Sequence, residues 1–257
     1  MKILAVDTST QSGGVALLDG QDLIAGLYMT STKTHAKRLM SDVDTMLRMA
    51  NMGLNECDGF VVTTGPGSFT GLRIGISTVK GFAFATGKPV AGVSTLNVLA
   101  CQFPWFSELV CPMLDARKGE IYTALYRYRS QDNWAQISPE CVVDPKEWLM
   151  QIKAPCLFVG NGAVLYRDLI KQELGDQARF APPYLNIPQA AVAAWIGMRQ
   201  IEKGGAVDVA SLVPNYIRQS DAEIKLDGLV KSPQTDDTVK SSRSKARYCS
   251  QAVRRNS

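Results

Sequence analysis

The sequence predicts an α/β protein with two related lobes and a C-terminal tail that stays unfolded. The main observation is a repeat: an apolar strand, an aspartate, a polar turn, a glycine and a second apolar strand occur around Asp7 and again around Asp115. Segments with the helical period of apolar residues follow each copy. We expect lobes over residues 1–105 and 106–226, each with a mixed sheet and flanking helices, and a basic tail over 227–257.

The first lobe is expected to open with three antiparallel strands. Apolar runs over residues 3–6, 14–18 and 23–29 are separated by polar turns, which predicts a meander rather than the start of a Rossmann unit. The later elements are expected as helices over 34–51, about 70–85 and 95–101, the last capped by Ser94, and strands over 60–62 and 89–93.

The second lobe is expected to repeat this order after a division near residues 104–108. A turn at Lys118-Gly119 follows Asp115, which matches Asp7 in the first copy. The expected elements are strands over 110–114, 121–128 and 156–159 and helices over about 163–173 and 188–202.

Length and hydropathy exclude a membrane protein. A chain of 257 residues can bury a core that needs neither disulfide bonds nor a metal ion. The longest apolar run, Ala190 to Met198, has nine residues, far fewer than the roughly 20 of a membrane helix. The apolar start closes at Asp7 and is too short for a signal peptide. We expect a soluble, cytoplasmic protein with no membrane partner.

The net charge of +4 resides in the tail. Residues 227–257 hold seven basic and three acidic residues, so residues 1–226 are neutral and create no general field for nucleic acid. Only four tail residues are Leu, Ile, Val or Phe, which predicts disorder. The tail is interpreted as an RNA-binding arm or a dispensable extension, and its lack of pattern favours the extension.

Histidine and cysteine usage excludes the common metal sites. His35 is the only histidine, and the six cysteines include no C-x-x-C pair. A zinc or iron site needs several such ligands at close spacing, so we expect no metal centre. His35 begins an expected helix and is interpreted as a solvated residue.

The strongest local motif is T-T-G-P-G-S-F-T-G-L-R-I-G, residues 63–75, which follows a strand and opens a helix that Ser68 or Thr70 can cap. Glycines let backbone N–H groups approach an anion at a helix N-terminus. The motif is interpreted as a phosphate cradle or as a tight turn without a ligand. It matches neither a dinucleotide fingerprint nor a nucleophile elbow, and Gly87-Lys88 precedes proline, which excludes a P-loop.

Two aspartates complete the candidate site. Asp7 and Asp115 end strands beside turns, where a carboxylate can hold a metal-bound water against a phosphate. The commoner role of such an aspartate is to cap its own turn. The candidate phosphate contacts are Asp7, Ser9, Gly65, Gly67, Ser68, Gly71 and Asp115.

The helix after the glycine motif carries an apolar stripe of Leu72, Ile76 and Val79, with Gly71 and Gly75 beside it. Packing onto the sheet and contact with a second protein both explain this pattern, and periodicity alone favours the core. Methionines around the preceding helix fit either role because Met packs adaptably.

Four segments together resemble the TsaB (YeaZ) family: I-L-A-V-D-T-S-T at 3–10, the glycine motif at 63–75, L-D-A-R-K-G-E-I-Y at 114–122 and P-N-Y-I-R at 214–218. The resemblance covers about residues 1–223. It implies an actin/Hsp70/sugar-kinase type fold. It also implies the bacterial subunit needed to make threonylcarbamoyladenosine in transfer RNA, a paralogue of the catalytic subunit TsaD.

The resemblance further implies a protein that is not an enzyme on its own and has no catalytic residue. Its implied partners are a TsaD-type subunit, a TsaE-type ATPase, a second copy when TsaD is absent, and transfer RNA through the complex. No cofactor is held by the chain alone, although ATP or ADP can sit at the partner interface. Helices of the first lobe form the family interface, so its candidates are Leu39, Val43, Met46, Leu72, Ile76 and Val79.

Other functions stay open on the residues alone. An ATP-dependent phosphotransferase or ATPase of the same fold type would use Asp7 and Asp115 to flank the phosphates. A glycoprotease-like peptidase has less support, because the chain offers neither a metal site nor a triad. Direct binding of transfer RNA through the tail is a third alternative.

Overall fold

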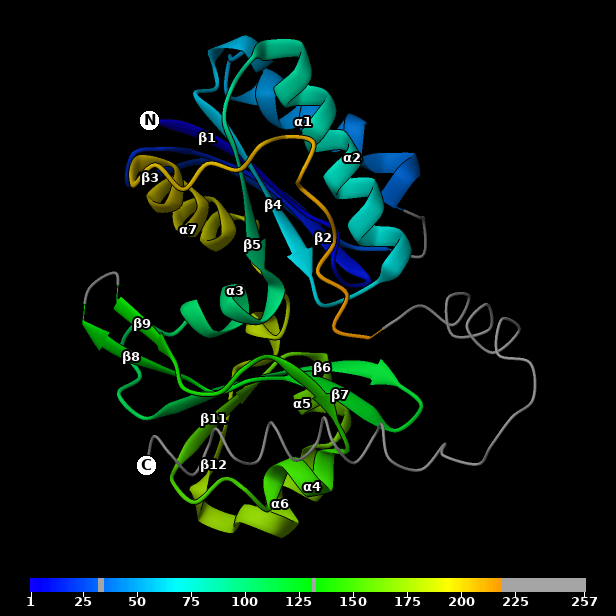
Figure 1. The fold of residues 1–257 in the computed structure, drawn as a ribbon, viewed down its shortest axis with the longest axis vertical. Helices are drawn as coiled ribbons and strands as arrows, with labels where there is room; N and C mark the ends of the chain where they lie inside the picture. Colours follow the sequence, from blue (N-terminus) through cyan, green and yellow to red (C-terminus); the bar gives the residue numbers. More distant parts are fainter. Residues whose placement is uncertain (32–34, 131–132, 219–257) are drawn as a thin grey trace, which may run out of the picture. The chain divides into compact units, whose positions relative to one another are not determined.

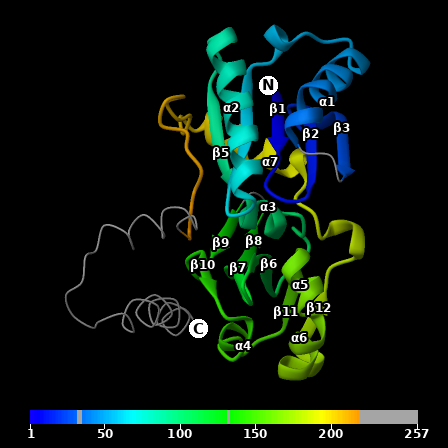
Figure 2. The same ribbon diagram turned by 90° about the vertical axis from the view of Figure 1, so that its right-hand side faces the viewer.

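The structure, a computed structural model, describes residues 1–31, 35–130 and 133–218 (Figures 1 and 2). The chain forms two compact units. Unit 1 contains Met1–Phe103 and Pro182–Asn215, and unit 2 contains Pro104–Ala181 and the described residues 216–218. The tail predicted over 227–257 lies outside the described residues. No helix in the described part of the chain combines the length and apolarity needed to span a membrane.

Unit 1 is built on a five-stranded sheet with the order β3-β2-β1-β4-β5. The predicted meander is confirmed, because β1 pairs antiparallel with β2 and β2 pairs antiparallel with β3. β4 and β5 then add in parallel on the other side of β1. The strands are β1 (Lys2–Asp7), β2 (Ser12–Asp19), β3 (Asp22–Thr30), β4 (Gly59–Gly65) and β5 (Val90–Ser94).

Helices cover both faces of this sheet, which explains why β1 and β4 are apolar on both sides. Leu4 and Val6 of β1 pack toward α1 and α2, whereas Ile3 and Ala5 pack toward α7 (Figure 1). Ser94 caps α3 as predicted, since its Oγ accepts hydrogen bonds from the N–H groups of the first turn. The helices are α1 (His35–Met49), α2 (Phe69–Thr86), α3 (Thr95–Cys101) and α7 (Ala190–Glu202), with short 3₁₀ turns η1 (Leu54–Glu56) and η3 (Pro183–Leu185).

The position of α7 corrects the expected lobe boundaries. The sequence placed residues 106–226 in one lobe, but the segment Pro182–Asn215 belongs to unit 1. The physical reason is the small-residue face of α7, where Ala193, Ala194 and Gly197 are buried against the sheet. A side chain at Gly197 would collide with Val61 of β4, so the helix lies directly on that strand.

Unit 2 repeats the strand order of unit 1. Its central sheet path is β10-β7-β6-β11-β12, in which an antiparallel partner and a parallel partner again flank the strand that ends near the aspartate (Figure 2). This match confirms the predicted α/β fold of two related lobes. The strands are β6 (Leu109–Arg117), β7 (Glu120–Thr123), β8 (Tyr126–Ser130), β9 (Asn133–Gln136), β10 (Cys141–Val143), β11 (Cys156–Val159) and β12 (Ala178–Phe180).

Two expected elements of unit 2 are divided. The strand expected over 121–128 is two strands, because Leu125 is bonded to Ile137 and Ser138 instead of continuing along β6. The helix expected over 163–173 breaks at Tyr166, whose backbone leaves the helical conformation. The helices of unit 2 are α4 (Pro145–Leu149), α5 (Asn161–Leu165) and α6 (Arg167–Leu174), with the 3₁₀ turn η2 (Gly175–Gln177).

Candidate functional site

Asp7, at the end of β1, is buried with only 1% of its surface exposed. Its Oδ1 accepts hydrogen bonds from the Ser9 hydroxyl at 2.6 Å, the Ser9 N–H at 3.2 Å and the Thr63 hydroxyl at 2.7 Å. Its Oδ2 is buried and has no partner among the described residues. Burial raises the pKa of Asp7, and the hydrogen bonds from Ser9 and Thr63 oppose that shift. The carboxyl group therefore ties the β1–β2 turn to β4.

The glycine motif packs against this same turn. The Ser68 N–H donates to the Ser9 carbonyl at 2.7 Å, and the Thr8 hydroxyl donates to the Gly71 carbonyl at 2.8 Å. A side chain at Gly67 or Gly71 would collide with the carbonyl oxygens of Ser9 and Thr8, respectively. The glycines are therefore needed for close contact between two backbone segments of unit 1.

The other end of the motif contacts the C-terminal part of unit 1. The Asn215 N–H donates to the Thr64 carbonyl at 2.7 Å, and the Asn215 carbonyl lies against Gly65. Gly65 has a φ of +117°, a conformation that favours glycine. Ser68 caps α2 as predicted, because its Oγ accepts a hydrogen bond from the Gly71 N–H at 3.2 Å.

These contacts do not fit a phosphate inside the glycine motif. The N–H groups of Ser68 and Gly71 already donate to protein oxygens, and the open side of the glycines is filled by Thr8 and Ser9. Asp7 and Ser9 are both buried. The structure thus brings six of the seven predicted phosphate contacts together in unit 1, but as a packed joint. The seventh belongs to unit 2.

Asp115 is exposed and caps its own turn. Its Oδ1 accepts a hydrogen bond from the Arg117 N–H at 2.8 Å, while its own N–H donates to the Asn161 side chain at 3.1 Å. The following residues Arg117, Lys118 and Gly119 all have positive φ, which forms the tight β6–β7 turn. Asp115 thus takes the commoner of the two roles considered from its sequence position.

Arg218 joins two of the four motifs singled out in the sequence. Its guanidinium donates to the Ala116 carbonyl at 3.1 Å and forms an ion pair with Glu120 at 3.0 Å. Arg218 ends the P-N-Y-I-R segment, whereas Ala116 and Glu120 belong to L-D-A-R-K-G-E-I-Y. The arginine therefore braces the β6–β7 turn, a role that sequence spacing did not reveal.

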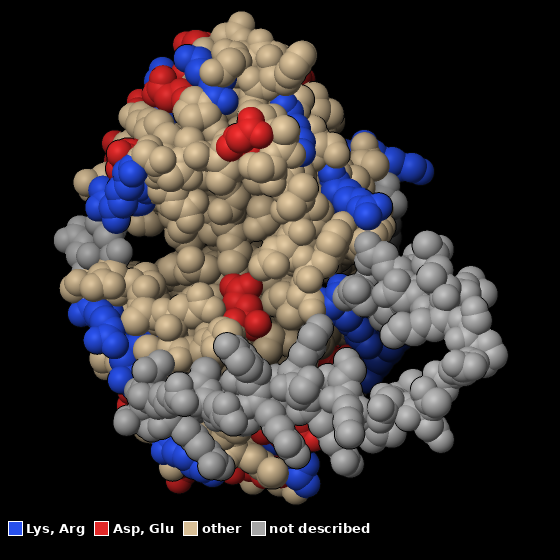
Figure 3. Space-filling model, in the orientation of Figure 1, with Lys and Arg blue, Asp and Glu red and all other residues tan. Residues whose placement is uncertain are grey.

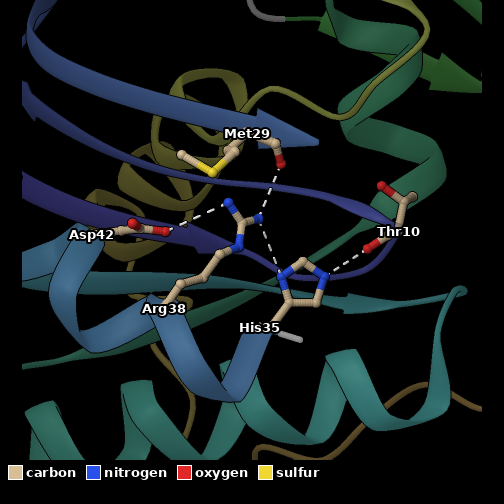
Figure 4. Close-up of polar contacts among 5 residues, drawn as sticks. All are labelled: Thr10, Met29, His35, Arg38 and Asp42. Atoms are coloured by element: carbon tan, nitrogen blue, oxygen red, sulfur yellow. Dashed lines mark hydrogen bonds and ion pairs between the residues drawn. The ribbon is translucent and has the colours of Figure 1, made fainter. Parts of the chain in front are cut away.

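His35 is not the solvated residue that its sequence position indicated. Its Nε2 lies 2.8 Å from the Thr10 carbonyl, and its Nδ1 lies 3.4 Å from the Arg38 guanidinium (Figure 4). A carbonyl can only accept a hydrogen bond and a guanidinium can only donate one. The imidazole hydrogen is therefore on Nε2, which donates to Thr10, and Nδ1 accepts from Arg38. Arg38 also donates to the Met29 carbonyl and pairs with Asp42. The network fastens the start of α1 to the β1–β2 turn and to the end of β3.

The predicted interface residues point inward. All six residues expected at the partner interface are at most 5% exposed, so none of them lies on the surface of the chain: Leu39, Val43, Met46, Leu72, Ile76 and Val79. All but Leu72 belong to the core that also contains Leu4 and Val6 of β1. The periodicity of apolar residues identified the correct two helices. It marked their core-facing side, because the apolar side of an amphipathic helix is the side that packs on the core.

The outer side of the same two helices is different. On α2 the exposed positions include Arg73, Ser77, Gly81 and Phe84, which recur at intervals of three and four residues. Phe84 is 91% exposed, and nothing lies within 4 Å of the place where a side chain at Gly81 would begin. On the neighbouring α1, two methionines on opposite flanks of the helix are more than half exposed: Met40 and Met49. We call the exposed sides of these two helices the α1–α2 outer face.

No group of three or more His, Cys, Asp and Glu side chains that could hold a metal ion occurs within residues 1–31, 35–130 and 133–218.

Comparison with known proteins gives a consistent result. Residues 29–226 match the family model described as TsaD, tRNA N6-adenosine threonylcarbamoyltransferase. The tRNA threonylcarbamoyladenosine biosynthesis protein TsaB of Bacillus subtilis is 35% identical over 228 residues, which are 88% of this chain and 97% of the relative. TsaB of Escherichia coli is 32% identical over 234 residues, 89% of this chain and 99% of the relative. A crystal structure from Pseudomonas aeruginosa, of an uncharacterized protein with similarity to peptidase YEAZ, superposes with a TM-score of 0.73 at 30% identity and covers 84% of this chain and 99% of its own.

Proposed function

Because this chain belongs to the TsaB family of tRNA threonylcarbamoyladenosine biosynthesis proteins, we propose that it is the non-catalytic subunit of the complex that makes this modification. It pairs with a TsaD-type subunit. That subunit transfers threonylcarbamoyl from threonylcarbamoyl-AMP to the adenosine on the 3′ side of the anticodon. The chain itself supplies a binding surface rather than a reacting group.

The state of the candidate side chains supports a non-catalytic role. Asp7 is buried and bonded to Ser9 and Thr63, Ser68 caps α2, and Asp115 caps the β6–β7 turn. Each of these groups has a structural partner that accounts for its position. The same contacts argue against the ATPase alternative, which requires Asp7 to approach a phosphate.

The α1–α2 outer face is the observation that carries the proposal. An aromatic ring that is 91% exposed, beside the bare backbone of Gly81 and near a second helix with exposed methionines, suits the packing of a partner helix. Burying a phenylalanine side chain contributes about 1.5–3 kcal/mol. This energy favours whichever conformation of the partner presents the matching surface, so activation proceeds by a shift of population.

The remaining partners follow from this arrangement. Without a TsaD-type subunit, the same face pairs two copies of the chain. A TsaE-type ATPase and transfer RNA join through the assembled complex in the cytoplasm. The glycine motif within unit 1 is filled by its own backbone, so a nucleotide that takes part in the complex, ATP or ADP, would bind outside this motif.

The test is Phe84→Glu, mixed with a purified TsaD-type subunit. A charge at this position opposes burial, so we expect the heterodimer to weaken by roughly thirtyfold or more, the range of an interface hot spot. Light scattering measures the mass of the complex across a dilution series. Leu165→Glu is the matched control, since Leu165 is 59% exposed on α5 of unit 2 and lies off the outer face.

Two results would contradict the proposal. Failure of the wild-type chain to form any complex with the TsaD-type subunit removes the partner role. Wild-type affinity in Phe84→Glu, with a loss in Leu165→Glu, moves the interface to unit 2. Thermal melting of both variants confirms that each remains folded.

A further inference from the structure

Unit 2 carries a two-stranded ribbon that extends past its sheet. β8 pairs with β6 only through Tyr126 and Arg127. Farther along, Tyr128 and Ser130 pair with β9 alone. Figure 1 draws these two strands side by side at one edge of the unit. The outer part of β8 and β9 is therefore a free-standing ribbon.

A pair of aromatic rings holds the ribbon together. Tyr128 and Trp134 are directly opposite each other, with ring centroids 5.5 Å apart in an edge-on arrangement. Such a cross-strand pair stabilises two strands. Because strand side chains alternate between faces, the rings occupy one face of the ribbon and Arg127, next to Tyr128, occupies the other. Arg129 lies where the pairing register shifts between Tyr128 and Ser130, so it stands at an irregular point of the ribbon.

These two arginines have no counter-charge in the described part of the chain. Both are exposed, and neither forms an ion pair or hydrogen bond with a described side chain. By contrast, Arg38, Arg48 and Arg199 of unit 1 each pair with an acidic residue. In Figure 3, Lys and Arg atoms show at the surface where Figure 1 draws β8 and β9. The ribbon thus presents two exposed arginines, two residues apart on β8, without an internal role among the described residues.

Two exposed guanidinium groups close together on one strand suit phosphate groups along a nucleic acid backbone. Guanidinium binds phosphate through two parallel hydrogen bonds, and the wide minor groove of A-form RNA is read through its phosphates and hydroxyls. The neutral charge of residues 1–226 provides no general attraction, so local arginines are needed for any such contact. We propose that Arg127 and Arg129 of the β8–β9 ribbon contact the phosphate backbone of RNA. That this RNA is transfer RNA rests on the proposed function.

The experiment compares charge-matched variants of the full chain in complex with a TsaD-type subunit. Arg127→Ala/Arg129→Ala should bind transfer RNA about tenfold more weakly at ~0.15 M salt. The slope of log affinity against log salt should become shallower by about two, one for each lost phosphate contact. Lys153→Ala/Lys171→Ala removes the same charge from exposed positions elsewhere in unit 2 and should leave both quantities near wild type. Arg127→Lys/Arg129→Lys should keep most of the salt slope.

The outcomes separate this inference from the proposed function. Complex mass is measured first. If no complex forms, the proposed function fails. The same RNA titration of wild type and variants, carried out on the chain alone, then tests whether Arg127 and Arg129 contact RNA. If the complex forms and the arginine and lysine variants bind RNA equally, the ribbon inference alone is overturned. It is also overturned if the arginine variant loses the protein partner instead, or loses only binding to phosphatidylserine vesicles.

Discussion

Asp7 and Asp115 hold matched positions in two sheets of the same strand order, yet their surroundings differ completely. Asp7 is buried and accepts hydrogen bonds from Ser9 and Thr63. Asp115 is exposed and accepts one from the Arg117 N–H. The difference originates in the segment that follows β4 in unit 1 and the matching strand β11 in unit 2. In unit 1 the glycines at the start of α2 pack on the β1–β2 turn beyond Asp7, whereas in unit 2 the glycine at the start of α5, Gly162, packs on the backbone of Met113 and Leu114 before Asp115.

This comparison shows what an internal repeat specifies. The repeated apolar runs determine strand order, because each run must find the same neighbours to bury its faces. They do not determine the environment of the aspartate, since that depends on which backbone segment the next loop contacts. One corner has become a packed joint and the other a surface turn.

The largest effect should come from filling the joint. In Gly71→Ala the new methyl group meets the Thr8 carbonyl, a backbone atom that cannot turn aside. We expect a loss of about 3 kcal/mol, or a fall in melting temperature of roughly 6 °C or more. Gly119→Ala in the other corner has open space around it but a φ of +79°, so it should lose only about 1 kcal/mol. Equal losses in thermal melting would contradict the distinction between the two corners.

A smaller effect, with a pH signature, should follow from Asp7→Asn. Burial raises the pKa of Asp7 in the folded chain above its ordinary value of 3.8, so the folded state holds this proton more tightly than the unfolded state. Stability from this group is full below the ordinary pKa and is lost as pH rises through the folded pKa. Asparagine has no proton to lose, so the variant should gain on the wild type between pH 4 and 8, by about 1 kcal/mol. Denaturant titrations across this range measure the difference, and a relative loss at high pH would refute it.

The smallest effect is expected from Asp115→Ala. The variant loses one exposed hydrogen bond to the Arg117 N–H, which contributes about 1 kcal/mol or less. Hydrogen exchange should show faster exchange of the Arg117 amide, while amides of β1 and β4 stay protected. A destabilisation larger than that of Gly71→Ala would mean that the surface turn, rather than the buried joint, limits stability.

Most of unit 1 could be predicted because its patterns are long and regular. The meander, α2 with its Ser68 cap, and α3 with its Ser94 cap all agree with the expected elements. The short strands β9, β10 and β12 lacked any pattern of their own, since they form only where neighbouring strands offer free hydrogen-bonding groups. The division of the strand expected over 121–128 into β7 and β8 has the same origin, because Leu125 forms its hydrogen bonds with Ile137 and Ser138.

The candidate site was predicted in place but not in role. A glycine loop looks the same in a sequence whether it makes room for a ligand or for another part of the backbone. Gly67 and Gly71 therefore did not reveal that Ser9 and Thr8 occupy the space beside them. Likewise, the apolar stripe through Ile76 located α2 but marked its buried side, so the exposed Phe84 was not among the expected interface residues.

Unit 1 is made of two separate chain segments, which has a consequence for its folding during synthesis on the ribosome. A ribosome completes all five strands of this sheet, and then all of Pro104–Ala181, before it delivers α7. Until then the short helix α3, through Val98, is the described helix that packs on the side of the sheet bearing Ile3, Ala5 and Val61. Most of the apolar surface that α7 later covers therefore stays open through much of synthesis, and such transiently exposed surface is prone to aggregation.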